Sequence, residues 1–270
     1  MATELKFWGV RGSTPTPMVA NLGYGGNTTC IEIKDNRGDR IIFDAGSGIR
    51  ELGRAIAAEG KAQNLDLFLT HFHWDHIQGI PFFAPLLMAG NRVTFHSFLP
   101  GSEIRARLER QMSDPYFTLD FNSVGAGKEF RQTITGFRRG GLSVTAFPLH
   151  HPQGAFGYRV ESEEGTIVIA TDLEHGHPEL DKVLREYSEG ADVLIYDAQY
   201  TPGEYESRKG WGHSTYAGGA SVARDANAKK LVLFHHDPTH NDTAMSEIVK
   251  ETVPLFENSI AAREHDIISL

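Results

Sequence analysis

The sequence predicts one α/β domain built on mixed β-sheets. Short apolar runs with strand character alternate with amphipathic helical runs along the whole chain, and no internal repeat, low-complexity tract or linker interrupts them. Hydrophobic residues make up 40% of the 270 residues and charged residues 23%, enough for a sizeable core. We therefore expect a single domain over residues 1–270.

In the first half of the chain, turn residues and hydrophobic spacing define the expected elements. Ile49, Leu52 and Ile56 recur at helical spacing and predict a helix over 49–58. Alternating apolar runs bounded by turn residues predict strands. The strands expected here are 30–33, 40–45, 65–70 and 92–98; a proline-interrupted helix is expected over 77–90 and a charged helix over 103–112.

The second half continues the alternation after a less regular segment at 113–140. That segment places Tyr116, Phe117 and Phe121 among Pro, Asn and Gly, and it is either a lid over a pocket or a packed surface loop. Pro254 should bend or split the final helix. The expected strands are 142–149, 156–161, 166–171, 191–198 and 230–234, and the expected helices are 215–227 and one from about 243.

Charge and cysteine content narrow the class of protein. A net charge of −9, from 35 acidic and 26 basic residues, disfavours a protein that clamps a long nucleic acid, although bound metal ions could still attract a small anionic substrate. Cys30 is the single cysteine, so no intrachain disulfide can form. The N-terminus lacks a signal-peptide pattern and no apolar run is long enough to span a membrane. We expect a cytoplasmic protein without a membrane partner.

Potential metal ligands follow four separate predicted strands. The segment THFHWDH places His71, His73, Asp75 and His76 directly after the strand at 65–70. His150 and His151 follow the strand at 142–149, Asp172 follows 166–171, and His235 and His236 follow 230–234. Functional groups of open α/β sheets collect beyond the carboxyl ends of strands, so these donors could converge. A histidine-rich polar turn would not explain four such strand ends.

The donor set favours a pair of ions. Imidazole and carboxylate suit zinc, manganese or iron, and the lack of clustered cysteines argues against a structural zinc knot. Six or seven ligands are too many for one tetrahedral ion, whereas two ions bridged by a carboxylate and a hydroxide fit the count. Zn²⁺ is the first choice, with Mn²⁺ or Fe²⁺ as alternatives.

These residues resemble the HxHxDH signature of the metallo-β-lactamase-fold hydrolases. FDAGSGIREL also resembles the family's Asp-Gly turn, and His151, Asp172 and His235 fall in order where its later ligands belong. The resemblance implies a four-layer αββα sandwich of two mixed β-sheets flanked by helices. It also implies that His71, His73 and His151 hold one ion, that Asp75, His76 and His235 hold the second, and that Asp172 bridges them.

The resemblance is to the phosphodiesterase branch, which includes ribonuclease Z and the cyclic phosphodiesterases. Asp172 stands where β-lactam-hydrolysing enzymes commonly carry cysteine, and GHST precedes a helix. The ligands matching His151 and Asp172 lie too close in sequence for the arm with which ribonuclease Z grips transfer RNA. This implies hydrolysis of a small phosphodiester, with a cyclic nucleotide as the leading candidate, by a metal-bridging hydroxide.

Two residues are expected to take part in the chemistry besides ligand binding. Asp75 could orient the hydroxide or shuttle its proton. By resemblance, His213 would bind the phosphate oxygens or protonate the leaving oxygen; alternatively it is a helix-start residue beside Ser214. Asp44 could orient a ligand imidazole or simply form a turn.

Several neighbouring residues and several functions stay open. His150 and His236 are expected to pack or to support the ligands, Asn27 and His175 could face the site, and His177 is expected in an exposed loop. Tyr116, Phe117, Phe121 and Trp211 could stack on a base or belong to the core. The alternative functions are a lactonase or thioesterase, an RNA-processing nuclease and a non-catalytic metal-bound sensor, and a homodimer is possible.

Overall fold

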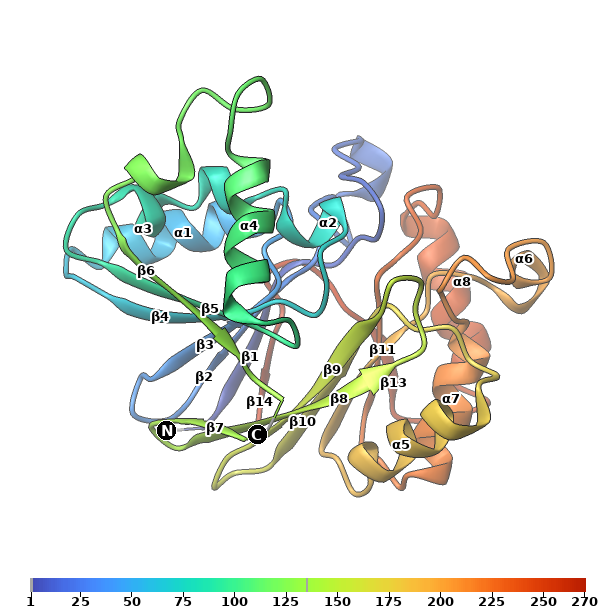
Figure 1. The fold of residues 1–270 in the computed structure, drawn as a ribbon. Coiled ribbons are helices and arrows are strands. Elements are labelled where there is room, and N and C mark those ends of the chain that lie inside the picture. The colour runs from blue at the N-terminus through green and yellow to red at the C-terminus, as the bar shows by residue number, and fades with distance from the viewer. Residues whose placement is uncertain (1, 135) are drawn as a thin grey trace.

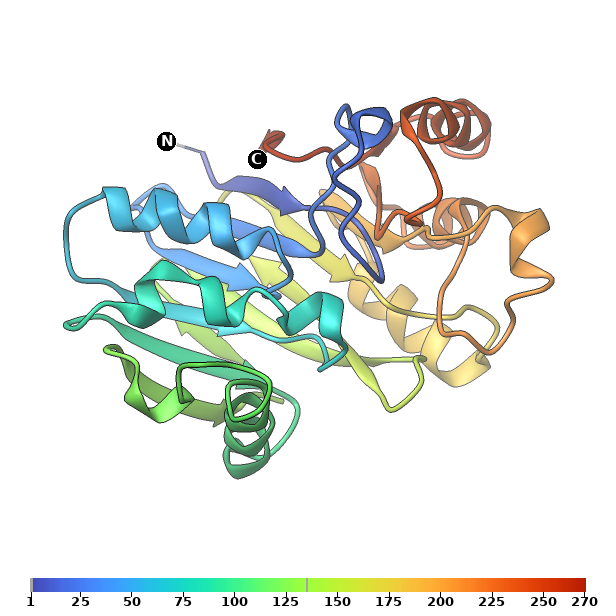
Figure 2. The same cartoon turned by 90° about the horizontal axis from the view of Figure 1, so that it is seen from above.

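The computed structural model describes residues 2–134 and 136–270, so Met1 and Thr135 lie outside the description. Two seven-stranded mixed sheets pack face to face, with helices on both outer surfaces (Figures 1 and 2). This arrangement confirms the predicted αββα sandwich. Among the residues described, none of the helices combines the length and apolar character that crossing a membrane requires.

Each sheet follows its own strand order. The first sheet runs β14 (Ile267–Ser269), β1 (Glu4–Gly9), β2 (Cys30–Lys34), β3 (Arg40–Phe43), β4 (Asn64–Phe68), β5 (Arg92–Ser97) and β6 (Gly127–Gln132). The second runs β13 (Ser259–Ala261), β12 (Leu231–Phe234), β11 (Val193–Asp197), β10 (Thr166–Ala170), β9 (Ala155–Glu161), β8 (Leu142–Leu149) and β7 (Phe137–Arg139). Strands β3 to β6 are parallel, as are β10 to β13.

Helices divide between the two outer faces (Figure 1). The first sheet carries α1 (Ile49–Ala58), α2 (Trp74–Ile77), α3 (Ala84–Leu87) and α4 (Gly101–Gln111). The second carries α5 (Pro178–Ser188), α7 (Tyr216–Asp225) and α8 (Asp242–Thr252). The short α6 (Pro202–Tyr205) and the 3₁₀ turns Val19–Asn21, Ile80–Phe82 and Phe121–Ser123 lie in connections.

Three apolar clusters hold the layers together. The central cluster lies between the sheets and joins side chains such as Phe43 and Phe68 of the first sheet to Tyr158 and Phe234 of the second. A second cluster packs α1, α3 and α4 on the first sheet, and a third packs α5, α7 and α8 on the other. Each sheet is therefore covered on both faces, which explains why the central strands read as continuous apolar runs.

The segment 113–140 is more regular than predicted. It contains β6 and β7, so the expectation of an irregular segment is wrong over 127–132 and 137–139. Phe121 is fully buried and Phe117 packs against the core, whereas Tyr116 is exposed. The part around Tyr116 is free of the core, and its movement as a lid stays a prediction.

Candidate metal centre

Strand ends from both sheets bring the predicted ligands to one edge of the sandwich. The segment after β4 supplies four donors from the first sheet, and the segments after β8, β10 and β12 supply His151, Asp172 and His235 from the second. The loop-and-helix segment from His71 to α2 places its side chains opposite those of the second sheet. The site therefore spans the junction of the two sheets.

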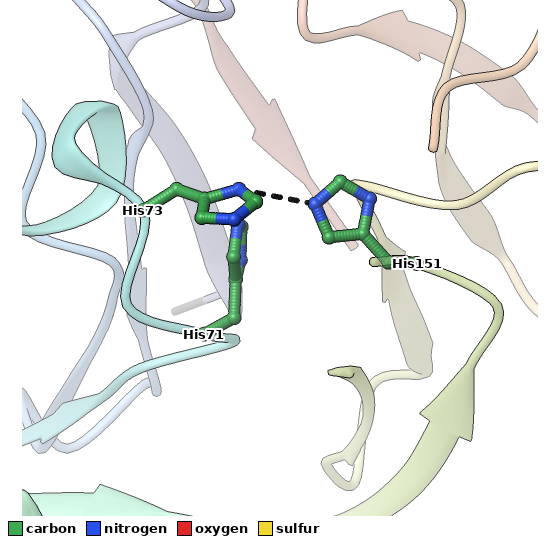
Figure 3. Close-up of side chains that lie close together, drawn as sticks. All are labelled: His71, His73 and His151. Carbon is green, nitrogen blue, oxygen red and sulfur yellow. Dashed lines mark hydrogen bonds between the residues drawn. The ribbon is translucent and has the colours of Figure 1, made fainter. Parts of the chain in front are cut away.

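The first donor cluster consists of His71, His73 and His151 (Figure 3). The three rings point toward one another across the junction, and Nδ1 of His73 lies 3.2 Å from Nε2 of His151. His71 and His151 are buried and His73 is partly buried. Within the described structure, the buried Nε2 of His71 has no hydrogen-bond partner. A buried nitrogen without a partner is costly unless a ligand such as a metal ion satisfies it.

The second cluster consists of the buried residues Asp75, His76, Asp172 and His235. Nε2 of His235 lies 3.1 Å from Oδ2 of Asp75 and 3.3 Å from Nε2 of His76. The backbone N–H of Ser13 donates to the same Asp75 oxygen at 2.7 Å. This contact fixes the carboxylate from a loop that the sequence did not associate with the site.

Asp172 lies between the two clusters. Its Oδ2 is 3.2 Å from Nε2 of His76, and its Oδ1 is 3.2 Å from Nε2 of His235 and 3.8 Å from Nε2 of His71. It therefore faces donors of both clusters at once. This is the position that a bridging carboxylate requires.

The two donor clusters contain five histidines. In each of them, the ring nitrogen that faces away from the cluster contacts a hydrogen-bond acceptor. Such partners fix the tautomer and the orientation of metal-binding imidazoles. Asp44, which also accepts from the Thr70 hydroxyl, accepts from His76 Nδ1 at 2.9 Å, as its predicted orienting role requires. The other acceptors are the Thr70 hydroxyl for His71, Gln153 Oε1 for His73, the Gly212 carbonyl for His151 and Gln199 Oε1 for His235.

The spacing of the donors fits divalent ions, and two of the histidines are neutral. Tetrahedral zinc with ligand bonds of about 2.0–2.1 Å separates its ligands by roughly 3.3 Å, and the closest donor pairs here are 3.1–3.3 Å apart. Burial lowers the pKa of His71 well below its ordinary value and that of His151 to about 4, so both rings are neutral. Burial would raise the pKa of Asp75, but contacts with His76 and His235 hold it below the ordinary range.

Three residues of the site have a left-handed backbone conformation, with positive φ. Asp44, Asp172 and His235 have φ of 61°, 60° and 60°, and all three follow a strand end. Non-glycine residues rarely adopt this conformation, and when they do they concentrate at functional sites. At each position the left-handed turn ends the extended strand and aims the side chain at the centre.

His213 lies beside the centre and has a carboxylate partner that the sequence analysis missed. Nδ1 of His213 donates to Oδ2 of Asp197 at 2.8 Å, and its ring stacks on His235 with centroids 4.9 Å apart. Burial would lower the pKa of His213, but the charge and hydrogen bond of Asp197 raise it to about 9. Asp197 ends β11, so the strand-end rule that located the other donors could also have found it.

The remaining candidates are held outside the two donor clusters. One ring nitrogen of His150 bonds the Glu174 carbonyl, and one of His236 bonds the Ala262 carbonyl. His175 bonds Ser214, and His177 accepts from Leu180 N–H at the start of α5. Asn27 is engaged by Glu264 and Ser47, and Trp211 is exposed.

Comparison with known proteins is consistent with this architecture. A family model described as a beta-lactamase superfamily domain matches residues 39–236. Ribonuclease BN of Cronobacter sakazakii is 25% identical over 313 aligned positions, covering 97% of this chain and 98% of the relative. Ribonuclease Z of Bacillus thuringiensis is 23% identical, covering 91% and 94%.

Solved structures share the fold over almost the whole chain. The metallo-β-lactamase-fold protein YhfI of Bacillus subtilis superimposes with a TM-score of 0.73 at 16% identity, covering 99% of both chains. A diphosphatase of the PhnP family gives 0.73 at 19% identity, covering 99% of this chain and 98% of that one. The short form of human tRNase Z gives 0.68 at 18%, covering 98% of both.

Proposed function

The chain belongs to the beta-lactamase superfamily and is a hydrolase with the metallo-β-lactamase fold, and from this premise we propose that it is a dinuclear metal-dependent phosphodiesterase for small substrates. One observation carries the proposal: the buried carboxylate of Asp172 faces donors of both clusters. A single-ion site would need no such shared carboxylate.

The candidate ligands fall into two groups, one for each ion. His71, His73 and His151 would hold the first ion, Asp75, His76 and His235 the second, and Asp172 both. Zn²⁺ suits this donor set best, and Mn²⁺ or Fe²⁺ also fit. When bound, two such ions lower the pKa of a water toward neutrality and neutralise charge that develops on a phosphate.

Three carboxylates and one histidine orient the ligands and the attacking water and transfer the proton. Asp172 sets the separation of the two ligand groups, and Asp75, fixed by Ser13 N–H, orients the attacking water. Asp197 fixes the tautomer of His213 and stabilises its protonated form, which leaves Nε2–H free to donate to the leaving oxygen. Burial of both partners keeps the pair aligned.

Several features favour a small substrate, with cyclic nucleotides as leading candidates. Strands β9 and β10 are joined by the short turn 162–165, which leaves no arm between His151 and Asp172. The alignment with ribonuclease BN runs over 313 positions although this chain has 270 residues, so the relative carries additional segments. The net charge of −9 also disfavours a long RNA.

RNA processing is the second candidate, because both curated relatives described above are named ribonucleases. A ribonuclease of this kind would bind precursor transfer RNA with an affinity that falls steeply as salt rises. Cleavage of such a precursor more efficient than that of cyclic nucleotides would favour this candidate over ours.

The test measures turnover and metal content on the same sample. We expect cleavage of bis(p-nitrophenyl) phosphate and of 2′,3′- or 3′,5′-cyclic nucleotides, with about two ions per chain. His73→Ala and Asp172→Ala should lose turnover and bound metal together. His265→Asn, at an exposed histidine with φ of 70°, should keep both and serves as the control.

His213→Gln separates proton donation from metal binding. The variant should keep its metal while kcat falls by about 10²–10⁴-fold, the usual contribution of general acid catalysis. Full activity of either ligand variant, or no phosphodiester cleavage by fully metallated protein, would reject the proposal. A lactone or thioester substrate would then be tested, and inactivity there would point to a metal-bound sensor.

A further inference from the structure

A groove runs from the metal centre between α2 and α4, which lie side by side in Figure 1. It consists of two cavities of about 250 and 320 Å³, which share Phe72 and Arg107 as lining residues. The inner cavity reaches His71 and His73, and the outer one extends past Trp74 to Tyr116. We call the combined space the α2–α4 groove; its other principal residues are Phe98, Leu99 and Arg110.

The α2–α4 groove is basic in an acidic protein. Arg107 and Arg110 line it, and the residues that form its walls include no Asp or Glu. The two arginines are three positions apart on α4, so they project from one helix face. Arg107 also pairs with Glu103 at 3.6 Å, but both side chains are about half exposed, and such a pair contributes little and can be exchanged for a ligand.

Aromatic side chains stand beside these cations. Trp74 is 65% exposed and Tyr116 71% exposed, and both face the outer cavity. The Arg107 guanidinium lies over the Phe72 ring at 5.2 Å, which orders the boundary between the two cavities. The amide of Gln111 donates to the Ile77 carbonyl at 2.7 Å and ties α4 to α2. These contacts hold the walls of the groove in fixed positions.

We propose that the α2–α4 groove binds a nucleoside of the substrate that carries a second phosphate. This inference rests on the proposed function, which places the scissile phosphodiester at the metal centre. Trp74 and Tyr116 stack on the base, while Arg107 and Arg110 contact the second phosphate. Among small phosphodiesters, the groove therefore favours a nucleotide that carries an additional phosphate group over the same nucleotide without it.

Kinetics with matched dinucleotides test this preference. Diadenylate is compared with its 5′-phosphorylated and 3′-phosphorylated forms, and the measured quantity is the ratio of KM without and with the terminal phosphate. We expect at least one phosphorylated form to have a KM lower by about tenfold, as for a partly exposed charge-assisted contact. Arg107→Met and Arg110→Met should each bring this ratio close to one.

Arg105→Met is the control, because Arg105 lies on the same helix but bonds Glu109 and Asn122 outside the groove. It should leave the ratio unchanged. A wild-type ratio of one, or equal ratios in wild type and both groove variants, would overturn the inference. Failure to cleave even bis(p-nitrophenyl) phosphate would instead reject the proposed function.

Ligand binding to the groove can also be measured without turnover, by tryptophan fluorescence. Of the three tryptophans, Trp8 is buried and Trp211 and Trp74 are exposed, so Trp211→Phe leaves Trp74 as the exposed reporter. Adenosine 3′,5′-bisphosphate should quench its fluorescence at concentrations about tenfold lower than adenosine does. Adding Arg107→Met should remove that difference, and adding Trp74→Phe should remove the quenching. Equal binding of the two ligands in the Trp211→Phe protein would contradict the groove assignment.

Discussion

At the scale of single residues, Asp44 controls the orientation of His76. Its Oδ1 accepts from Thr70 N–H and its Oδ2 from His76 Nδ1, so both oxygens act as acceptors. Asp44→Asn replaces one acceptor with an NH₂ group, yet asparagine tolerates the left-handed backbone at φ of 61°. We expect metal affinity to fall by about 10–100-fold with the fold retained. Competition titration with a chromophoric chelator measures this, and an unchanged affinity would show that Asp44 only forms the turn.

Gly12 shows how closely the N-terminal loop approaches the centre. A Cβ at this position would lie 2.4 Å from Nδ1 of His235 and 2.9 Å from Oε1 of Gln199. Gly12→Ala must therefore displace His235 or its hydrogen-bond partner, and we expect metal affinity to fall by about tenfold or more. Gly203→Ala is the matched control, because no atom lies within 4 Å of its added Cβ. The same chelator titration applies, and equal affinities in the two variants would contradict the steric argument.

At the scale of elements, a partly buried ion network ties the two sheets together away from the metal centre. Asp66 on β4 accepts from His96 on β5 at 2.8 Å and from Arg139 on β7 of the other sheet at 2.6 Å. Burial would raise the pKa of Asp66, but these two partners lower it below its ordinary value. Asp66→Asn should reduce the free energy of unfolding by about 2–3 kcal/mol at neutral pH, because it leaves buried polar groups poorly matched.

The pH dependence of that loss has a definite sign. Because the pKa of Asp66 is lower in the folded protein, its contribution is complete above the unfolded value of about 3.8 and disappears as pH falls through the folded value. The difference between wild type and Asp66→Asn in urea unfolding should therefore shrink as the pH falls below 3.8 (about the unfolded-state pKa). A difference that grew as the pH fell below this value would contradict the assignment.

Elements with strong hydrophobic periodicity were predictable from the sequence, and those placed by long-range pairing were not. The helix expected over 49–58 is α1, and the strands between 142 and 198 appear where predicted. The sequence did not predict β6, whose six residues include none that is buried, or β13 and β14, which have three residues each. It also did not predict β1 or the charged helix α5, in which only Leu184 and Ser188 are buried.

The donor residues were predictable for a related reason. A donor directly after an apolar strand is visible in the sequence, as His71 and His235 show, because the strand fixes where its end lies. No comparable sequence pattern identifies the groups that position the donors, namely Gln199, Gln153 and the backbone groups of Ser13 and Gly212. Their contacts depend on loops that come together only in the folded chain.

At the scale of the whole molecule, bound ions would link the two sheets. The donors after β4 come from the first sheet and those after β8, β10 and β12 from the second. The sheets also share a large apolar core, so we expect the metal-free protein to fold but to unfold at a lower temperature. Zinc at 100 times its dissociation constant should add about 2.7 kcal/mol per independent site, which raises Tm by roughly 5–10 °C for a chain of this size.

Scanning calorimetry of chelator-treated protein, with and without added zinc, measures this shift. Asp172→Ala removes the carboxylate that faces donors of both clusters, so its Tm should respond much less to zinc than that of wild type. His265→Asn should respond as wild type does, because the exposed His265 lies outside both clusters. If zinc left the wild-type Tm unchanged, the donors from the two sheets would not be joined through a common ion site. An equal shift in Asp172→Ala would mean that the ions bind without the shared carboxylate.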